Sequence, residues 1–163
     1  MYISILRQRT VWAGLFAAAV LAGCAAPSAP PVEPKAPPSC QAAANGDALA
    51  GNWLNIRKQK GVRGELRTLF TLHPDGTMAY TEQLKRGKQP SQGLSETGCW
   101  ARNQQILTVR TLQSNGAPVN LDDPIYTNQY TIVSANDKSL SLKDADGTII
   151  TARRMSPGYR LPF

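Results

Sequence analysis

From Leu49 to about Met155 the chain consists of short segments in which apolar and polar residues alternate, separated by turn signals. A period of two residues is typical of half-buried β-strands, and short strands at regular spacing are typical of β-sandwiches and barrels. The clearest turns are "PDGT" at 74–77, "NDKS" at 136–139 and "DADG" at 144–147. The eight predicted strands lie within 49–57, 65–73, 77–85, 97–102, 105–112, 125–133, 140–144 and 148–155.

The tight turns predict that consecutive strands pair antiparallel. A parallel sheet would need crossover helices, and no window after residue 24 shows helical periodicity. We therefore predict an all-β fold, an eight-stranded antiparallel up-and-down barrel in which closure leaves no strand edge unpaired. An open sheet and a two-layer sandwich are the alternatives. The predicted inward-facing residues are Leu54, Ile56, Phe70, Leu72, Met78, Tyr80, Trp100, Leu107, Val109, Tyr130, Ile132, Leu140, Leu142, Ile150 and Ala152.

The N-terminus has the pattern of a secretory signal peptide. Residues 1–9 carry two positive charges and no acid, and "VWAGLFAAAVL" at 11–21 is apolar but shorter than the roughly 20 residues of a membrane-spanning helix. The run ends in "LAGC" at 21–24, which resembles the bacterial lipobox. The resemblance implies that the signal peptide 1–23 is removed and that Cys24 is acylated. An uncleaved anchor with a buried Cys24 thiol is the alternative.

Residues 25–39 contain six prolines among mostly Ala and Ser, a composition that favours an extended tether. We predict a lipidated Pro/Ala-rich linker at 24–39 that carries a barrel domain at 40–163. Ala25, not an aspartate, follows Cys24. In the sorting rule that accompanies the lipobox this favours the outer membrane, with the domain in the periplasm or at the cell surface. The acyl chains make the lipid bilayer the first expected partner.

Two cysteines, Cys40 and Cys99, remain once Cys24 carries lipid. Because an extracytoplasmic compartment is oxidising, we predict one disulfide between them, with two free thiols as the alternative. A structural zinc site takes four soft ligands, so these two cysteines and one histidine predict no metal site, and no cofactor is expected.

The chain has a net charge of +7, and removal of Arg7 and Arg9 leaves 16 basic and 11 acidic residues, a net charge of +5. Basic residues cluster at 57–63 ("RKQKGVR") and 85–88 ("KRGK"), both expected at hairpin tips. Two interpretations stay open, solvated loops and contact with anionic envelope material. Nucleic acid is not an expected partner because no aromatic residues alternate with these cations.

Four segments in order, "GNW" (51–53), "LFTLHPDGTMAY" (69–80), "ETGCWARNQQILTV" (96–109) and "YTIVSANDKSLSLKDADGTIITARR" (130–154), resemble the small lipocalin-like domains of bacterial envelope lipoproteins. In lipocalins the tryptophan of a G-x-W motif packs at the closed end of the barrel beneath a basic residue of the last strand. The resemblance implies that Gly51, Trp53 and Arg154 form this barrel-closing motif, with Arg153 as the other candidate for the basic residue.

An eight-stranded barrel either is filled by side chains or holds one small ligand. Tyr80, Trp100 and Tyr130 are the candidate cavity-lining residues, with core or rim positions as the alternative. We do not expect an enzyme, because the sole histidine, His73, lies in a turn and no nucleophile–base pair is recognisable.

Three functions are compatible with these features. The first is a membrane-anchored, lipocalin-like module that binds a small apolar or amphiphilic molecule. The second is a protein-interaction module, either an enzyme inhibitor or an accessory component of an envelope assembly, acting through the loop at 113–124 and the two basic tips. The third is a purely structural lipoprotein. The C-terminal residues "SPGYRLPF" (156–163) are expected as a free tail or as a plug across one barrel mouth.

Overall fold

The computed structural model describes residues 38–58, 60–88 and 92–162. The predicted signal peptide, Cys24 and most of the linker therefore lie outside the described residues. No helix in the described part of the chain is long and apolar enough to span a membrane. The strands are β1 (Gly51–Arg57), β2 (Glu65–Leu72), β3 (Thr77–Lys85), β4 (Gln92–Asn103), β5 (Ile106–Ser114), β6 (Ala117–Pro118), β7 (Thr127–Ala135), β8 (Ser139–Lys143) and β9 (Ile149–Met155), and a 3-10 helix, η1, covers Pro124–Tyr126.

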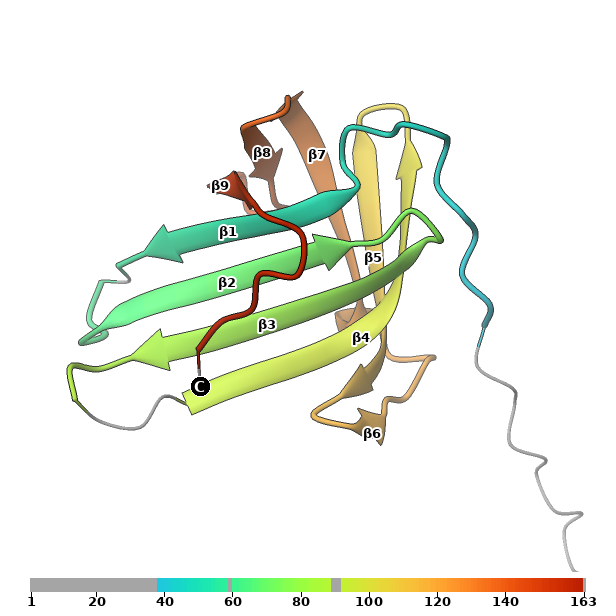
Figure 1. The fold of residues 1–163 in the computed structure, drawn as a ribbon. Helices are drawn as coiled ribbons and strands as arrows, with labels where there is room; N and C mark the ends of the chain where they lie inside the picture. The colour runs from blue at the N-terminus through green and yellow to red at the C-terminus, as the bar shows by residue number, and fades with distance from the viewer. Residues whose placement is uncertain (1–37, 59, 89–91, 163) are drawn as a thin grey trace, which may run out of the picture. The chain divides into compact units, whose positions relative to one another are not determined.

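The strands form a closed antiparallel barrel (Figure 1). Neighbours along the sheet follow the order β4-β3-β2-β1-β9-β8-β7-β5, and β4 also pairs with β5 to close the ring. The short β6 adds only a two-residue pairing to β5. The predicted eight-stranded up-and-down barrel is therefore confirmed, and the open sheet and the sandwich are excluded. Strand β4 starts five residues earlier than expected, because its ladder with β3 continues to the pair Leu84 and Gln92.

The two ends of the barrel differ in what covers them. Because neighbouring strands are antiparallel, the turns at 73–76, 104–105 and 136–138 all lie at one end, together with the N-terminal segment 38–50. We call this the closed end. The connections after β1, β3 and β8, and the loop that contains β6 and η1, lie at the opposite end, which we call the open end.

The main core fills the barrel from the closed end. Its buried members come from every strand of the ring and from the N-terminal segment: Leu49, Trp53, Phe70, Leu72, Met78, Trp100, Leu107, Val109, Ile132, Leu140, Leu142 and Ala152.

The prediction that Leu54 and Ile56 face inward was wrong. Side chains alternate along a strand, and Trp53 takes the inward position of β1, so its neighbour Leu54 faces outward. Leu54 is buried there in a second cluster, and Ile56 is 45% exposed.

The second cluster lies on the outer face of the barrel, beneath the C-terminal tail. Leu161 packs with Leu54 and Leu69 and is 4% exposed, with Met155 and Tyr159 against them. Asn52 Nδ2 donates a hydrogen bond of 2.9 Å to Ser156 O, and Gln83 Nε2 donates to Pro162 O. Figure 1 shows this red segment crossing β1, β2 and β3.

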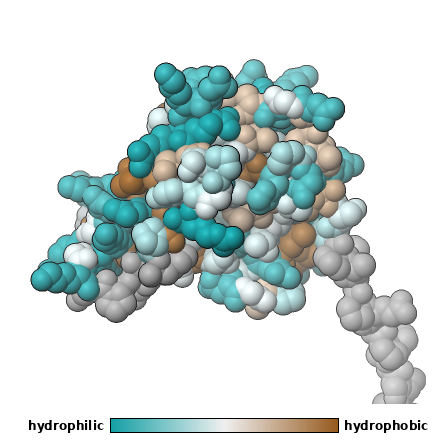
Figure 2. All heavy atoms as spheres, in the orientation of Figure 1, coloured by the Kyte–Doolittle hydropathy of each residue, from teal (hydrophilic) through white to brown (hydrophobic). Residues whose placement is uncertain are grey.

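The tail is therefore neither free nor a plug of the barrel mouth, as far as residue 162. It folds back because Leu54 and Leu69 make this part of the outer face apolar. On the face drawn in Figure 2, hydrophobic residues reach the surface only as separate patches among hydrophilic ones.

The disulfide between Cys40 and Cys99 is confirmed, with 5.2 Å between the Cα atoms. It holds the N-terminal segment against β4, and Ala43 N donates a hydrogen bond of 2.9 Å to Pro74 O in the adjacent turn. Gly76 in that turn has a positive φ of 83°, and a Cβ there would collide with the Gln41 carbonyl. Only glycine combines this conformation with so close an approach.

Candidate functional site

Trp53 and Arg154 lie together at the closed end. The Arg154 guanidinium carbon is 4.1 Å from the centroid of the buried Trp53 ring. The pairing of β1 with β9 sets Trp53 opposite Arg154 and Leu54 opposite Arg153, so Arg154 faces inward and Arg153 is exposed. Gly51 makes room for this arrangement, because a Cβ at Gly51 would collide with Arg154 Nη1.

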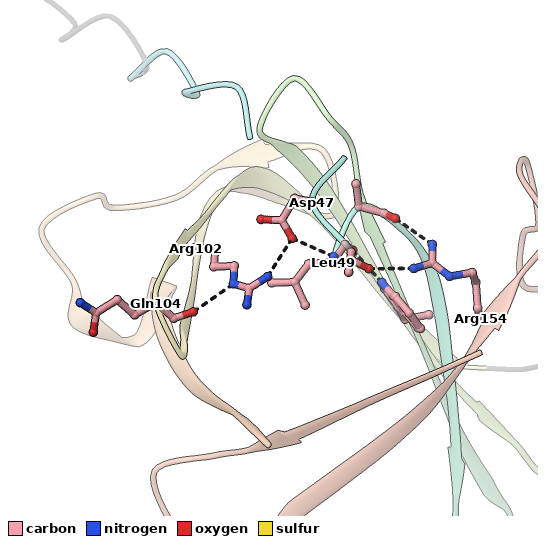
Figure 3. A network of polar contacts seen from close by, with 8 residues as sticks. Asp47, Leu49, Arg102, Gln104 and Arg154 are labelled. Carbon is pink, nitrogen blue, oxygen red and sulfur yellow. Dashed lines mark hydrogen bonds and ion pairs between the residues drawn. The ribbon is translucent and has the colours of Figure 1, made fainter. Parts of the chain in front are cut away.

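Hydrogen bonds to the N-terminal segment complete this arrangement (Figure 3). Arg154 donates to Ala50 O at 2.8 Å and to Ala48 O at 2.7 Å. Trp53 Nε1 donates to Leu49 O at 2.8 Å. The guanidinium therefore supplies hydrogen-bond donors to two backbone carbonyls that would otherwise be unpaired. These bonds hold the N-terminal segment across this end of the barrel, so the role of the arrangement is structural.

An ion pair also secures the N-terminal segment. Arg102 on β4 lies 3.2 Å from Asp47, whose Oδ1 also accepts a hydrogen bond of 2.9 Å from Leu49 N (Figure 3). Arg102 Nε also donates a hydrogen bond of 2.9 Å to Gln104 O, and this bond orients the guanidinium toward the Asp47 carboxylate. Sequence inspection missed this pair, since nothing local connects positions 47 and 102.

The candidate ligand site is a cavity of about 630 Å³ at the open end. This volume falls within the range of small-molecule sites, about 300–1,000 Å³. Residues from β1, β2, β3, β7 and β9, together with η1 and the β8–β9 turn, line it: Asn55, Arg57, Thr68, Phe70, Tyr80, Pro124, Thr127, Asn128, Gln129, Tyr130, Asp144, Ala145, Asp146 and Ile150.

Two of the three predicted cavity residues, Tyr80 and Tyr130, line this cavity. Trp100 is not among the lining residues. It is 2% exposed in the core, and its Nε1 donates a hydrogen bond of 2.8 Å to His73 O in the turn between β2 and β3. Trp100 directly follows Cys99, the last β4 residue that pairs with β3. Its inward-facing side chain therefore lies beside the turn that connects β2 with β3.

Three aromatic rings form the apolar part of the cavity wall. Phe70 packs edge-to-face against Tyr80, with ring centroids 5.0 Å apart, and against Tyr130, with centroids 6.2 Å apart. Edge-to-face pairs at these distances are favourable arrangements of aromatic quadrupoles. The cross-strand pairing of Phe70 with Tyr80 sets two of these rings side by side on the inner face.

The two tyrosines carry neutral hydroxyls in acidic surroundings. Burial raises the pKa of Tyr80, and its hydrogen bond to Glu82 Oε2, 2.7 Å long, raises that pKa further. Burial also raises the pKa of Tyr130, reinforced by the charges of Asp144 and Glu96 and opposed by Arg57. Both hydroxyls therefore remain protonated at neutral pH and act as hydrogen-bond donors.

Asn55 is the lining residue with an unmet hydrogen-bonding need. It is 9% exposed, and its Nδ2 donates to Thr151 O on β9 at 2.7 Å. Its Oδ1 is buried without a partner among the described residues. A buried acceptor left unpaired is unfavourable by about 1–3 kcal/mol, so a donor from a ligand would be stabilising. Sequence inspection missed Asn55 because β1 was assigned the opposite phase.

Basic and acidic residues lie on different connections at the open end. The connections after β1 and β3 carry the two predicted basic clusters, and a surface depression of about 650 Å³ lies between them. Lys58, Val62, Gly64, Glu65, Arg67, Lys85 and Gly87 line this depression. The β6–η1 loop and the β8–β9 turn carry acidic residues instead, including Asp144 and Asp146 at the cavity.

His73 lies at the opposite end of the barrel from the adjacent Asp122 and Asp123. His73 is exposed in a closed-end turn, whereas Asp122 and Asp123 are exposed in the open-end loop. Asp123 caps η1, accepting a hydrogen bond of 3.0 Å from Ile125 N. Within the described ranges, no group of three or more His, Cys, Asp or Glu residues is arranged to hold a metal ion.

Comparison with protein-family models and comparison with curated proteins both give no match for this chain. The assignment of a function therefore depends on the geometry of the barrel and its cavity.

Proposed function

We propose that this protein is a lipid-anchored, lipocalin-like envelope lipoprotein that binds one small amphiphilic molecule in the open-end cavity. The observation that carries the proposal is the cavity itself, about 630 Å³ in volume and lined by aromatic rings beside polar groups. Phe70, Tyr80 and Ile150 offer contacts to an apolar body. Asn55 and the charged rim offer contacts to a polar head.

A binding role fits this site better than a catalytic one. The aromatic rings and the buried amide offer shape and hydrogen bonds, whereas catalysis by a nucleophile needs a base beside it. The only histidine, His73, lies in a turn at the opposite end of the barrel from the cavity. We therefore propose that the protein is not an enzyme.

The proposed anchor is the acylated sulfur of Cys24, and the proposed site of attachment is the outer membrane. The lipobox resemblance at 21–24 and the absence of an aspartate after Cys24 support it. One acyl chain binds a membrane reversibly, and two or more hold firmly. The barrel would then be held at the end of a proline-rich linker, in the periplasm or at the cell surface.

The anchor predicts that Cys24→Ala abolishes acylation. Cells fed an alkyne analogue of palmitate should label the wild-type chain. The variant should stay unlabelled and keep its leader, because in lipobox processing the peptide bond between Gly23 and Cys24 is cleaved only after the cysteine is acylated. Immunoblots after click labelling measure both outcomes. A Cys40→Ala variant that still labels is the matched control. A wild-type chain that takes up no label would refute the proposed anchor.

The cavity predicts that Ile150→Trp displaces a bound molecule, whereas Ile149→Trp does not. Ile150 lines the cavity, and its neighbour Ile149 is 51% exposed on the outside of the barrel. An indole in the cavity should reduce the ligand that copurifies by about tenfold or more, because it overfills the space that the ligand needs. Native mass spectrometry of the full-length chain, extracted from membranes, gives the bound fraction.

The two tryptophan variants share the same strand and the same added mass. Equal ligand occupancy in both would show that the molecule binds elsewhere. Wild-type protein that carries no copurifying molecule in repeated preparations would contradict the proposed binding function.

A further inference from the structure

The charge at the cavity is opposite to that of the whole chain. The chain has a net charge of +7, yet Asp144 and Asp146 line the cavity, and Arg57 is the only cation among the described residues that line it. Arg57 is exposed at the rim, whereas Asp144 is half-buried. Two more carboxylates, Glu82 and Glu96, neighbour Tyr80.

These two glutamates belong to the interior of the barrel. Glu96 lies directly opposite Tyr80 in the β3–β4 ladder, and Glu82 Oε2 accepts the hydrogen bond of the Tyr80 hydroxyl. Glu96 is also 3.3 Å from the hydroxyl of Thr111, which is 2% exposed. Carboxylates so placed give the cavity a negative potential that water screens less than it would at the surface.

We infer that the ligand of this cavity is an organic ammonium ion with a small apolar body. The inference rests on the proposed binding function and specifies its ligand class. Three features converge on a cation: aromatic rings, carboxylates and a buried acceptor. The faces of Phe70, Tyr80 and Tyr130 are negative, and rings of this kind attract a cation within about 6 Å.

Asn55 distinguishes an ammonium that carries N–H groups from other cations. Its Nδ2 is held by Thr151 O, which orients the amide and leaves Oδ1 as an acceptor without a partner among the described residues. A primary amine that reaches Oδ1 would supply the missing donor. A quaternary ammonium has no N–H group and would leave Oδ1 unpaired.

A metal ion fits the same site poorly. Hard cations such as Ca²⁺ take six or more oxygen ligands at close range. Within residues 38–58, 60–88 and 92–162, no three carboxylate, thiol or imidazole groups are close enough together for this. The aromatic wall would also offer a metal ion nothing to coordinate, whereas it matches the apolar body of an organic amine.

Three probes of nearly equal size test the inference: 2-phenylethylamine, 2-phenylethanol and 3-phenylpropionate. They share the aromatic body and differ in carrying a positive, a neutral or a negative head. Isothermal titration calorimetry with the full-length chain in a nonionic detergent gives each Kd. We expect the amine to bind about tenfold more tightly than the alcohol, and the carboxylate to bind most weakly.

Two variants with the same change in net charge locate the effect. Asp144→Asn keeps an oxygen that can accept the hydrogen bond from Thr148 N, so the β8–β9 turn is preserved. It should weaken binding of the amine by about three- to tenfold and weaken binding of the alcohol by less, because the alcohol carries no charge. Asp137→Asn removes one charge from an exposed closed-end turn and should change neither Kd.

A third variant tests the unpaired acceptor. Asn55→Leu should remove much of the advantage in affinity that the primary amine has over N,N,N-trimethyl-2-phenylethylammonium.

The outcomes separate the ligand class from the binding function. If the alcohol binds as tightly as the amine, or if Asp144→Asn and Asp137→Asn have equal effects, the ammonium assignment is overturned and the cavity remains a ligand site. If none of the three probes binds, the ammonium assignment fails. Native mass spectra that show an empty cavity would then remove the binding function as well.

Discussion

Removing the disulfide with the double substitution Cys40→Ala/Cys99→Ala is expected to lower the free energy of unfolding by about 4 kcal/mol. The two cysteines are 59 residues apart in sequence, so the cross-link restricts a long loop of the unfolded chain. In the folded state it also holds the N-terminal segment whose Leu49 is fully buried at the closed end. Denaturant unfolding, monitored by tryptophan fluorescence, gives the change.

The wild-type chain in reducing agent is the internal reference for this prediction. Reduction should shift its unfolding midpoint close to that of the double variant, and the variant itself should not respond to reductant. Equal stability of the oxidised wild type and the variant would mean that the cross-link adds nothing to the closed end. That result would also remove the reason to expect the domain to depend on an oxidising compartment.

Replacing Arg154 with alanine is expected to lower the free energy of unfolding by about 3 kcal/mol. The change removes the guanidinium above Trp53 and leaves the carbonyls of Ala48 and Ala50 without their donors. Each of these hydrogen bonds involves a charged donor, and such bonds contribute about 1.5–3 kcal/mol. Arg154 Nε is buried without a hydrogen-bond partner among the described residues, and the removal of this unpaired group reduces the total.

Arg153→Ala is the matched control for this variant. Arg153 is the preceding residue on β9, is exposed and faces away from Trp53, so its loss should change the free energy of unfolding by no more than about 0.5 kcal/mol. Chemical denaturation of both variants under identical conditions measures the difference. Similar values for the two variants would contradict the structural role of the Arg154 contact.

The strands of the barrel could be predicted because their pattern is local. Alternation along β2, β3 and β5, and turns such as "PDGT", define strand and connection within a few residues of each position. Tight turns then pair β2 with β3, β4 with β5, β7 with β8 and β8 with β9. The strand number favours closure but leaves an open sheet and a sandwich as alternatives, and local patterns do not give the register between β1 and β9. That register decides that Arg154, and not Arg153, lies over Trp53.

The phase of β1 could not be predicted, because this strand has apolar residues on both faces. Trp53 and Leu54 are neighbours, and only one of them can face the interior. Leu54 is buried on the outside by Leu161, about a hundred positions along the chain, and no local pattern reveals such a cover. Because Trp53 faces inward, Asn55, two residues later, also faces inward and lies at the cavity. The error in the phase of β1 therefore also hid the most informative residue of the candidate site.

The sequence by itself determined the all-β class and predicted the antiparallel succession of the strands and the pairing of Cys40 with Cys99, since these depend on residue type, spacing and cysteine number. Only the tertiary structure decided which face of β1 is inner, where the C-terminal tail lies and that the open end contains a cavity. The physical reason is that each of these results from contacts between residues remote in sequence. Which surface is buried depends on what covers it, and the covering segment is known only once the chain has folded.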